Sequence, residues 1–296
     1  MYPTESVDGD PGGTAMIPER FDYVRPTSLD EAIRALADGG DDARPLAGGH
    51  SLLPLMKLRF ARPSLLVDLQ GLPGLAGIQR ENGTLRVGAL TRHAELQEAE
   101  LGVISEASHK IADQQVRNRG TIGGSLAHGD PASDWPALLL AYEGSVTVQG
   151  PDGQRVIEAA DLFKDYLSTS VRQGEIVTEA RLPTLEGFGG AYEKFTRRAE
   201  DWAMVGVLAL VKVSDGAVSD VRIGLTHMAS TPLRASAAEE ALRGRPLDAE
   251  SIAAAAEHAD AGTNPSADLN ATAEYKRHLA RVLTRRALTR AAGLNG

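Results

Sequence analysis

The sequence predicts an α+β protein made of two α+β subdomains followed by a C-terminal α+β subdomain, in which an antiparallel sheet is covered by helices. Three observations lead to this fold class. A capped helix and short buried strands come first, two hairpins with strong turn sequences follow, and the chain ends in Ala-rich helical stretches and an amphipathic helix. The pattern changes near Leu72 and again after Pro183. We therefore expect a domain of residues 16–186, divided into 16–71 and 72–186, and a C-terminal subdomain of residues 187–296.

The N-terminal unit follows a segment without periodicity. Residues 1–15 are rich in Gly, Asp and Pro, and we expect them to be a disordered extension. Ser28 and Glu31 predict a capping box for a helix that ends at a Gly-Gly pair. Short strands are expected around 44–46 and at 64–69, which makes this a small βα-type unit.

Two hairpins define the middle unit. Asn82-Gly83 is a strong signal for a type I′ turn, and Pro151-Asp152-Gly153 marks the second turn. Between the hairpins the pattern predicts a helix at about 103–113 and another in WPALLLAY (135–142). A strand at 175–183 and a linker at 183–190 complete this unit.

The C-terminal unit opens with a strand in AYEKFTRR (191–198) and a long apolar segment, MVGVLALVKV (204–213). Asp215-Gly216 then turns the chain into a strand that ends near Thr226. Two Ala-rich helices follow. The last helix is predicted to be amphipathic, with one face formed by Tyr275, Leu279, Val282, Leu283 and Arg286.

Composition excludes several classes of function. The formal charge of −9 and an aromatic content of 4% argue against a nucleic-acid partner, which needs a basic surface or a stacking platform. No apolar run approaches the ~20 residues that span a bilayer, and the N-terminus lacks the pattern of a signal peptide. We therefore expect a cytoplasmic protein without membrane insertion. The chain has no Cys, so it cannot hold an iron–sulfur cluster through thiolates, and its seven His residues show no spacing typical of a metal site.

Two Gly-rich stretches, AGGHS (47–51) and TIGGS (121–125), are the strongest candidates for a ligand site. The common alternatives GxGxxG, GxxxxGK[ST] and GxSxG are missing. Adjacent glycines allow consecutive backbone N–H groups to turn toward an anion, and a Ser or Thr hydroxyl adds a donor. Two such loops could hold the two phosphates of a pyrophosphate. The alternative is that both are only tight turns.

Three single residues each allow two interpretations. Asp134 could accept hydrogen bonds from sugar or ribityl hydroxyls, but its place before WPALLLAY favours a helix N-cap. Trp202 could be a core residue or a lid over an aromatic ligand. His50 could contact a phosphate or attach a flavin covalently, and a polar turn residue is the simpler interpretation.

Several motifs together resemble one family. RPLAGGHSLLPLMKLR (44–59) and GTIGGSLAHGDPASDWPALLLA (120–141) are similar to the FAD-binding medium subunit of molybdenum hydroxylases, in particular to carbon monoxide dehydrogenase medium chains and to xanthine dehydrogenase FAD subunits. The segments MIPERFDYVRP, YEKFTRRAEDWA and IGLTHMASTPLRA resemble the same family, in the same order. The resemblance implies an FAD-binding fold of the p-cresol-methylhydroxylase/vanillyl-alcohol-oxidase (PCMH/VAO) type.

The resemblance also implies a set of residues around non-covalent FAD. Two stretches would surround the pyrophosphate, Asp134 would lie against the flavin, Val177 near the adenine side and Lys194 near the isoalloxazine. Trp202 would flank the isoalloxazine face, where the carbon monoxide dehydrogenase chain has Tyr. The full expected set is Leu46, Ala47, Gly48, Gly49, His50, Ser51, Leu52, Thr121, Ile122, Gly123, Gly124, Ser125, Asp134, Val177, Lys194 and Trp202.

The implied function is electron transfer within a larger enzyme. The family places molybdopterin on a large subunit and [2Fe–2S] clusters on a small one, in a dimer of heterotrimers. FAD on this chain would pass electrons to an external acceptor, so no residue here is expected to act as a catalytic acid or base, and none as a metal ligand. The main alternative is a self-contained FAD-dependent oxidoreductase of the same fold, and a third hypothesis is a binding or scaffold protein without FAD.

Overall fold

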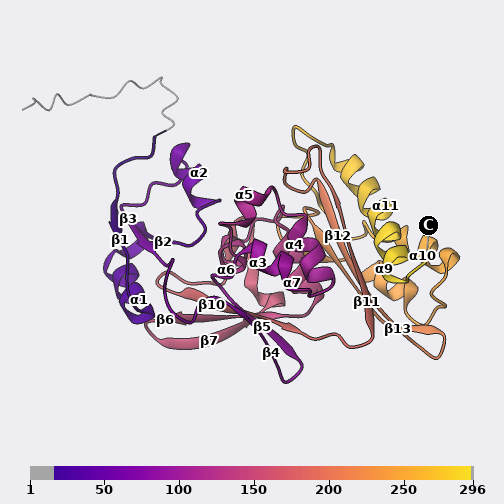
Figure 1. Ribbon diagram of the computed structural model, residues 1–296. Helices are drawn as coiled ribbons and strands as arrows, with labels where there is room; N and C mark the ends of the chain where they lie inside the picture. Colours follow the sequence, from indigo (N-terminus) through magenta and orange to yellow (C-terminus); the bar gives the residue numbers. More distant parts are fainter. Residues whose placement is uncertain (1–16, 295–296) are drawn as a thin grey trace, which may run out of the picture.

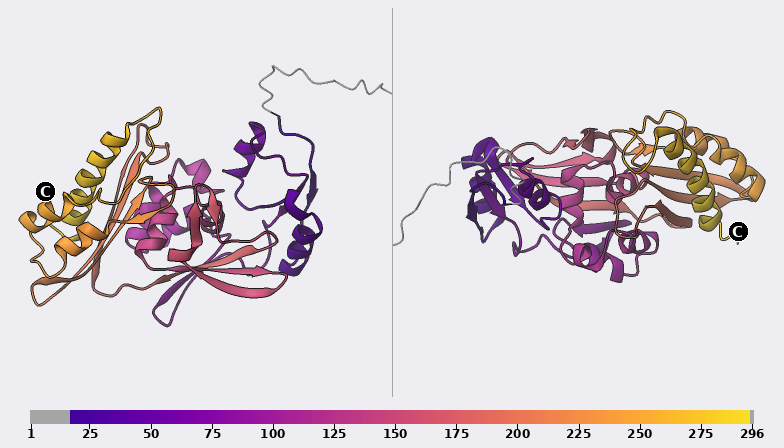
Figure 2. Two further views of the ribbon diagram at one scale, coloured as in Figure 1. Left: turned by 180° about the vertical axis from the view of Figure 1, so that it is seen from behind. Right: turned by 90° about the horizontal axis from the view of Figure 1, so that it is seen from above.

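The computed structural model describes residues 17–294, and the expected extension at 1–15 lies outside them. An N-terminal unit stands at one end of the molecule and a helix-covered sheet at the other, with a five-stranded sheet and several helices between them (Figure 1). The two further views in Figure 2 show the same three parts in a row. The fold is α+β, as the sequence predicts.

The N-terminal unit is a small parallel sheet with one long helix. Its strands lie in the order β1-β3-β2, and all pairs are parallel. Ser28 caps the first helix by accepting from the Glu31 N–H, while the Glu31 carboxylate accepts from Thr27. The elements are β1 (Asp22–Val24), α1 (Leu29–Asp38), the 3-10 turn Gly40–Asp42, β2 (Ala43–Leu46), α2 (Leu52–Lys57) and β3 (Leu65–Asp68).

The middle unit is a five-stranded antiparallel sheet in the order β4-β5-β10-β6-β7. Asn82 and Gly83 both have positive φ, as the predicted type I′ turn requires. The strands are β4 (Ile78–Glu81), β5 (Thr84–Gly88), β6 (Ser145–Gly150), β7 (Gly153–Glu158) and β10 (Ile176–Pro183), and β8 (Phe163–Asp165) with β9 (Ser168–Thr169) forms a separate small ribbon.

Helices of the middle unit lie above its sheet in Figure 1. They are α3 (His93–Glu98), α4 (Val103–His109), α5 (Gln114–Arg117), α6 (Ile122–His128), α7 (Asp134–Ala141) and α8 (Ala159–Leu162). The helix predicted at 103–113 ends earlier, at His109, because Ala112 has a positive φ and Asp113 caps α5 instead. The predicted linker at 183–190 is also shorter, since β10 reaches Pro183 and the next strand starts at Phe188.

The C-terminal unit is an antiparallel sheet of β11 (Phe188–Phe195), β12 (Val205–Ser214), β13 (Ala217–Thr226) and β14 (Leu233–Arg234). Its helices are α9 (Ser236–Leu242), α10 (Ala249–Ala256) and α11 (Ala273–Ala291). The predicted buried face of the last helix is partly wrong. Tyr275 and Arg286 are exposed, whereas Lys276, Ala280, Thr284, Ala287 and Leu288 are buried together with Leu279 and Leu283.

Candidate functional site

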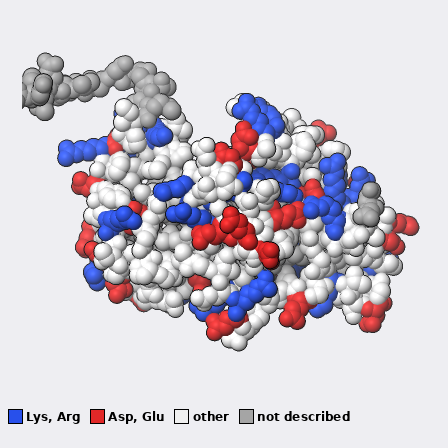
Figure 3. All heavy atoms as spheres, viewed as in Figure 1, with Lys and Arg blue, Asp and Glu red and all other residues white. Residues whose placement is uncertain are grey.

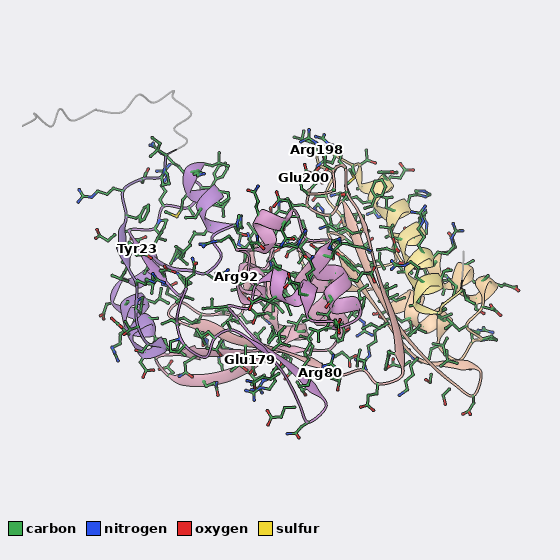
Figure 4. The ribbon with its side chains drawn as sticks, viewed as in Figure 1. Tyr23, Arg80, Arg92, Glu179, Arg198 and Glu200 are labelled. Atoms are coloured by element: carbon green, nitrogen blue, oxygen red, sulfur yellow. The ribbon has the colours of Figure 1, made fainter. Side chains whose placement is uncertain are left out.

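One cavity of about 750 Å³ lies among the three units. Its walls come from the loop after β2, the start of α6, the segment before β10 and the loop between β11 and β12. Small-molecule sites usually measure ~300–1,000 Å³, so the volume is that of a large ligand. Figure 4 shows Arg198 and Glu200 at the outer end of the β11–β12 loop, and Glu200 belongs to the cavity wall.

The AGGHS stretch is a loop that presents free backbone donors. Gly49 has φ +80°, a conformation that favours glycine, and Gln70 holds the loop by donating to the Ala47 carbonyl at 2.9 Å. Gly48 packs so tightly that a Cβ there would lie 2.4 Å from the Arg119 carbonyl oxygen. Among residues 17–294, no hydrogen-bond acceptor takes the N–H groups of residues 48–51. The loop therefore lines the cavity with backbone donors that have no partner in the described chain, which suits an anion.

We predicted that the TIGGS stretch is a loop, but it forms the beginning of α6. The Thr121 hydroxyl caps the helix by accepting from the Gly124 N–H at 3.2 Å. The N–H groups of Ile122 and Gly123 donate to the carbonyls of Thr91 and Ala89, so these donors are already used. A second anion nest therefore does not form here. This stretch instead forms part of the cavity wall next to the AGGHS loop, because a Cβ on Gly124 would lie 3.7 Å from the Ala47 Cβ.

Asp134 is a buried charge and not the predicted cap. Ser133 occupies the N-cap position of α7, and Asp134 is the first helical residue. Its Oδ1 accepts from the Tyr192 hydroxyl and its Oδ2 accepts from Lys194 Nζ at 3.0 Å. Burial and the neighbouring Asp134 carboxylate raise the pKa of Tyr192 well above its ordinary value, so the phenol stays a donor. The carboxylate is thus held rigidly at the cavity wall, and Lys194 also lies against the Lys110 carbonyl.

Two histidines line the cavity, His50 within the AGGHS loop and His93 at the start of α3. Burial, with the nearby Arg119 charge, lowers the pKa of His50. His93 is 5% exposed, and burial, with the charges of His50 and Arg117, lowers its pKa to about 4. The Trp135 indole N–H donates to His93 Nδ1 at 3.2 Å, so the neutral ring keeps its proton on Nε2. Sequence reasoning missed His93 because nothing near it in the chain marks it as polar and buried.

The remaining predicted residues divide into those at the cavity and one in the core. Trp202 is not a core residue, since its side chain is 56% exposed and lines the cavity. Val177 lies at a bulge in β10 and also lines it. Ile122 does not, because it is 1% exposed and packs in the core of the middle unit. The predicted residues that line the cavity are Leu46, Ala47, Gly48, Gly49, His50, Ser51, Leu52, Thr121, Gly123, Gly124, Ser125, Asp134, Val177, Lys194 and Trp202.

Two further properties concern the described part of the chain as a whole. Within residues 17–294, no three His, Asp or Glu side chains are grouped so that they could hold a metal ion. In the same range, the helices are too short or too polar to cross a membrane. On the face seen in Figure 3, Lys and Arg side chains are interspersed with Asp and Glu.

The fold is that of a flavoprotein subunit, as comparison with known families shows. The FAD-binding domain of molybdopterin dehydrogenases matches residues 19–185, and the C-terminal domain of carbon monoxide dehydrogenase flavoproteins matches residues 190–291. The chain belongs to this family, the FAD-binding subunits of molybdenum-dependent dehydrogenases. It is therefore an oxidoreductase subunit whose cofactor is FAD.

Particular relatives cover nearly the whole chain. The carbon monoxide dehydrogenase medium chain of Hydrogenophaga pseudoflava is 43% identical, with 93% of this chain and 98% of the relative aligned. The alpha subunit of the 6-hydroxypseudooxynicotine dehydrogenase complex of Paenarthrobacter nicotinovorans is 42% identical, with 93% of this chain and 96% of the relative aligned.

Solved structures agree. The carbon monoxide dehydrogenase structure from H. pseudoflava has a TM-score of 0.90 at 45% identity, covering 94% of this chain and 99% of that one. The structure of quinoline 2-oxidoreductase from Pseudomonas putida 86 has a TM-score of 0.89 at 32% identity, covering 93% of this chain and 98% of that one.

Proposed function

We propose that this chain receives electrons from [2Fe–2S] clusters on a partner subunit and passes them through FAD to an external acceptor. The observation that carries the proposal is the row of free N–H groups at residues 48–51, in a cavity of about 750 Å³. Bound FAD supplies the exchange between single electrons from clusters and electron pairs for an acceptor. The chain has no Cys for a cluster, so clusters and molybdopterin would belong to partner subunits.

The residues present fit FAD. The N–H groups of Gly48, Gly49, His50 and Ser51 would hold the pyrophosphate, which is the charge that such a nest binds. Asp134, fixed by Tyr192 and Lys194, would offer its carboxylate to the flavin or its hydroxylated chain.

The less polar parts of FAD would meet less polar walls. Val177 would contact the adenine side, and Trp202 would cover one face of the isoalloxazine. In this proposal, residues 16–186 form the FAD-binding domain, with subdomains 16–71 and 72–186, and residues 187–296 close one end of the site.

The proposed assembly is a dimer of heterotrimers, each with a small [2Fe–2S] subunit and a large molybdopterin subunit. The names of the relatives support a multi-subunit enzyme, since they are medium chains or complex subunits.

Gly49→Ala in the chain co-produced with its partner subunits tests the site. An alanine at φ +80° is strained, and its methyl group would clash with Leu53, so the N–H groups of residues 48–51 would change direction. We therefore expect FAD to bind about tenfold more weakly, the equivalent of one lost hydrogen bond. Bound FAD is measured by flavin absorption and by release on denaturation. Gly40→Ala is the matched control, because Gly40 also has positive φ but lies in open space outside the cavity.

Two results would contradict the proposal. A purified wild-type complex without flavin would exclude FAD as the electron carrier. Turnover of a substrate by this chain alone, without a cluster-bearing partner, would favour the self-contained flavoenzyme instead.

A further inference from the structure

A buried lysine in α11 has three hydrogen-bond partners. Lys276 is completely buried, and its Nζ contacts the Ser266 carbonyl at 2.9 Å, Asp268 Oδ2 at 2.6 Å and His227 Nε2 at 3.3 Å. Burial would raise the pKa of Asp268, but the hydrogen bond from Lys276 and the N–H groups of Asn270 and Ala271 lower it to about 2. The ammonium is thus fully satisfied, and its charge is balanced.

His227 extends this network toward the cavity. An ammonium can only donate, so His227 Nε2 accepts from Lys276 and the proton of the neutral ring lies on Nδ1. His227 Nδ1 lies 2.7 Å from the Ala203 carbonyl and therefore donates to it. The backbone N–H of His227 donates to the Pro131 carbonyl at 2.8 Å. His227 therefore hydrogen-bonds to two separate segments of the chain, each of which contributes to the cavity wall.

The two segments are those that carry Trp202 and Asp134. Ala203 follows Trp202 directly, and Pro131 lies three residues before Asp134. The other hydrogen bonds of the β11–β12 loop lie at its base, where Met204 donates to Phe195, and at its tip, where Arg198 and Asp201 pair. Within residues 17–294, the Trp202 indole N–H has no acceptor. The His227 ring thus comes from outside the loop and fixes the backbone beside Trp202.

The conformation of His227 sets a further condition. Its φ is +64°, which is uncommon for a residue with a Cβ and costs of the order of 1 kcal/mol or more. Glycine or asparagine would adopt it more easily. The ring contacts of His227 offset this cost.

We propose that His227, held by Lys276 and Asp268, is a positioning residue that places Trp202 at the mouth of the flavin site. This inference rests on the proposed function, because it assigns to Trp202 the face of the isoalloxazine. A purely structural role for the Lys276 network is the competing explanation. The two differ in whether His227 acts through Trp202.

His227→Gly tests the proposal, since glycine accepts φ +64° and keeps the N–H bond to Pro131 while Lys276 retains Ser266 and Asp268. In the chain without FAD, we expect acrylamide to quench tryptophan fluorescence more strongly. Trp135 is buried, so the change reports on Trp202. His278→Ala is the control. His278 is exposed and lies on α11, the helix that carries Lys276, so its loss should leave quenching unchanged.

A double-mutant cycle on the complex completes the test. We expect His227→Gly to weaken FAD binding about tenfold, the equivalent of one hydrogen bond, and to have no further effect once Trp202→Ala is present. His227→Asp, which also tolerates positive φ but offers no donor to the Ala203 carbonyl, should behave like His227→Gly if the latter folds poorly.

Unchanged quenching, or equal losses of FAD affinity with and without Trp202, would overturn the positioning role. The quenching experiment needs no FAD, so its failure is separate from failure of the proposed function.

Discussion

The pKa of His93, about 4, links the site to the stability of the fold. The pKa of histidine in an unfolded chain is near 6.5. Between pH 4 and 6.5, His93 is therefore protonated in the unfolded chain and neutral in the folded chain. The stability that comes from the neutral ring is therefore complete above about pH 6.5 and is lost as the pH falls toward 4. The full effect is about 3 kcal/mol by linkage.

His93→Gln removes this titration, because an amide does not ionise in this range. We expect the free energy of unfolding of the wild-type chain to fall by about 2 kcal/mol more than that of the variant between pH 7 and pH 5. Urea unfolding at the two pH values measures it. His278→Gln, at an exposed histidine, should follow the wild type. Equal pH dependence of wild type and His93→Gln would mean that the fold does not lower the pKa of His93.

At the scale of an element, the start of α6 shows that two adjacent glycines have different roles. A Cβ on Gly123 would lie 2.4 Å from the Ala89 Cβ, whereas a Cβ on Gly124 would point toward the cavity and Ala47, with the cap hydroxyl of Thr121 at 2.9 Å. Gly123→Ala should therefore overpack the contact between α6 and Ala89, the residue after β5, and destabilise the chain by about 1–3 kcal/mol. Gly124→Ala should mainly lower FAD affinity.

Thermal unfolding and FAD titration of the two variants separate these effects. The reverse result, with a large stability loss for Gly124→Ala and a loss of FAD binding alone for Gly123→Ala, would be inconsistent with the packing of α6.

Elements that depend on local sequence could be predicted, and contacts between distant segments could not. The Asn82-Gly83 turn and the Ser28 cap were predicted because a few neighbouring residues determine them. The hydrogen-bond partners of Asp134 could not be predicted, because Tyr192 and Lys194 lie 58 and 60 residues away.

The buried face of α11 was missed for a related reason. Periodicity treats Lys276 as a solvent-facing residue, although Asp268 and His227 satisfy it inside the protein. Of the candidate site, the motifs and their cofactor could be predicted. The pairing of Asp134, the burial of His93 and the already occupied donors of α6 could not.

At the scale of the whole molecule, β12 joins the middle and C-terminal units through its two faces. Seven consecutive residues of this strand, from Val205 to Val211, are buried. Leu208 and Leu210 pack in the core that contains Trp135 and Leu138 of α7. The alternate residues Val205, Val207, Ala209 and Val211 pack in the core beneath α11. A strand covered on both faces is continuously apolar, which explains the long apolar segment in the sequence.

This arrangement predicts that the C-terminal unit does not fold well alone. Residues 187–296, produced as a separate fragment, would expose Tyr192, Leu208 and Leu210, which α7 covers in the whole chain. We expect the fragment to self-associate in size-exclusion chromatography and to bind an apolar dye, because an exposed apolar patch favours association. Adding residues 17–186 should reduce both effects. Leu208→Thr with Leu210→Thr, which keeps two β-compatible residues but makes that face polar, should reduce them in the fragment alone. A monomeric wild-type fragment with a cooperative melting transition and no dye binding would show that α7 is not needed to cover β12.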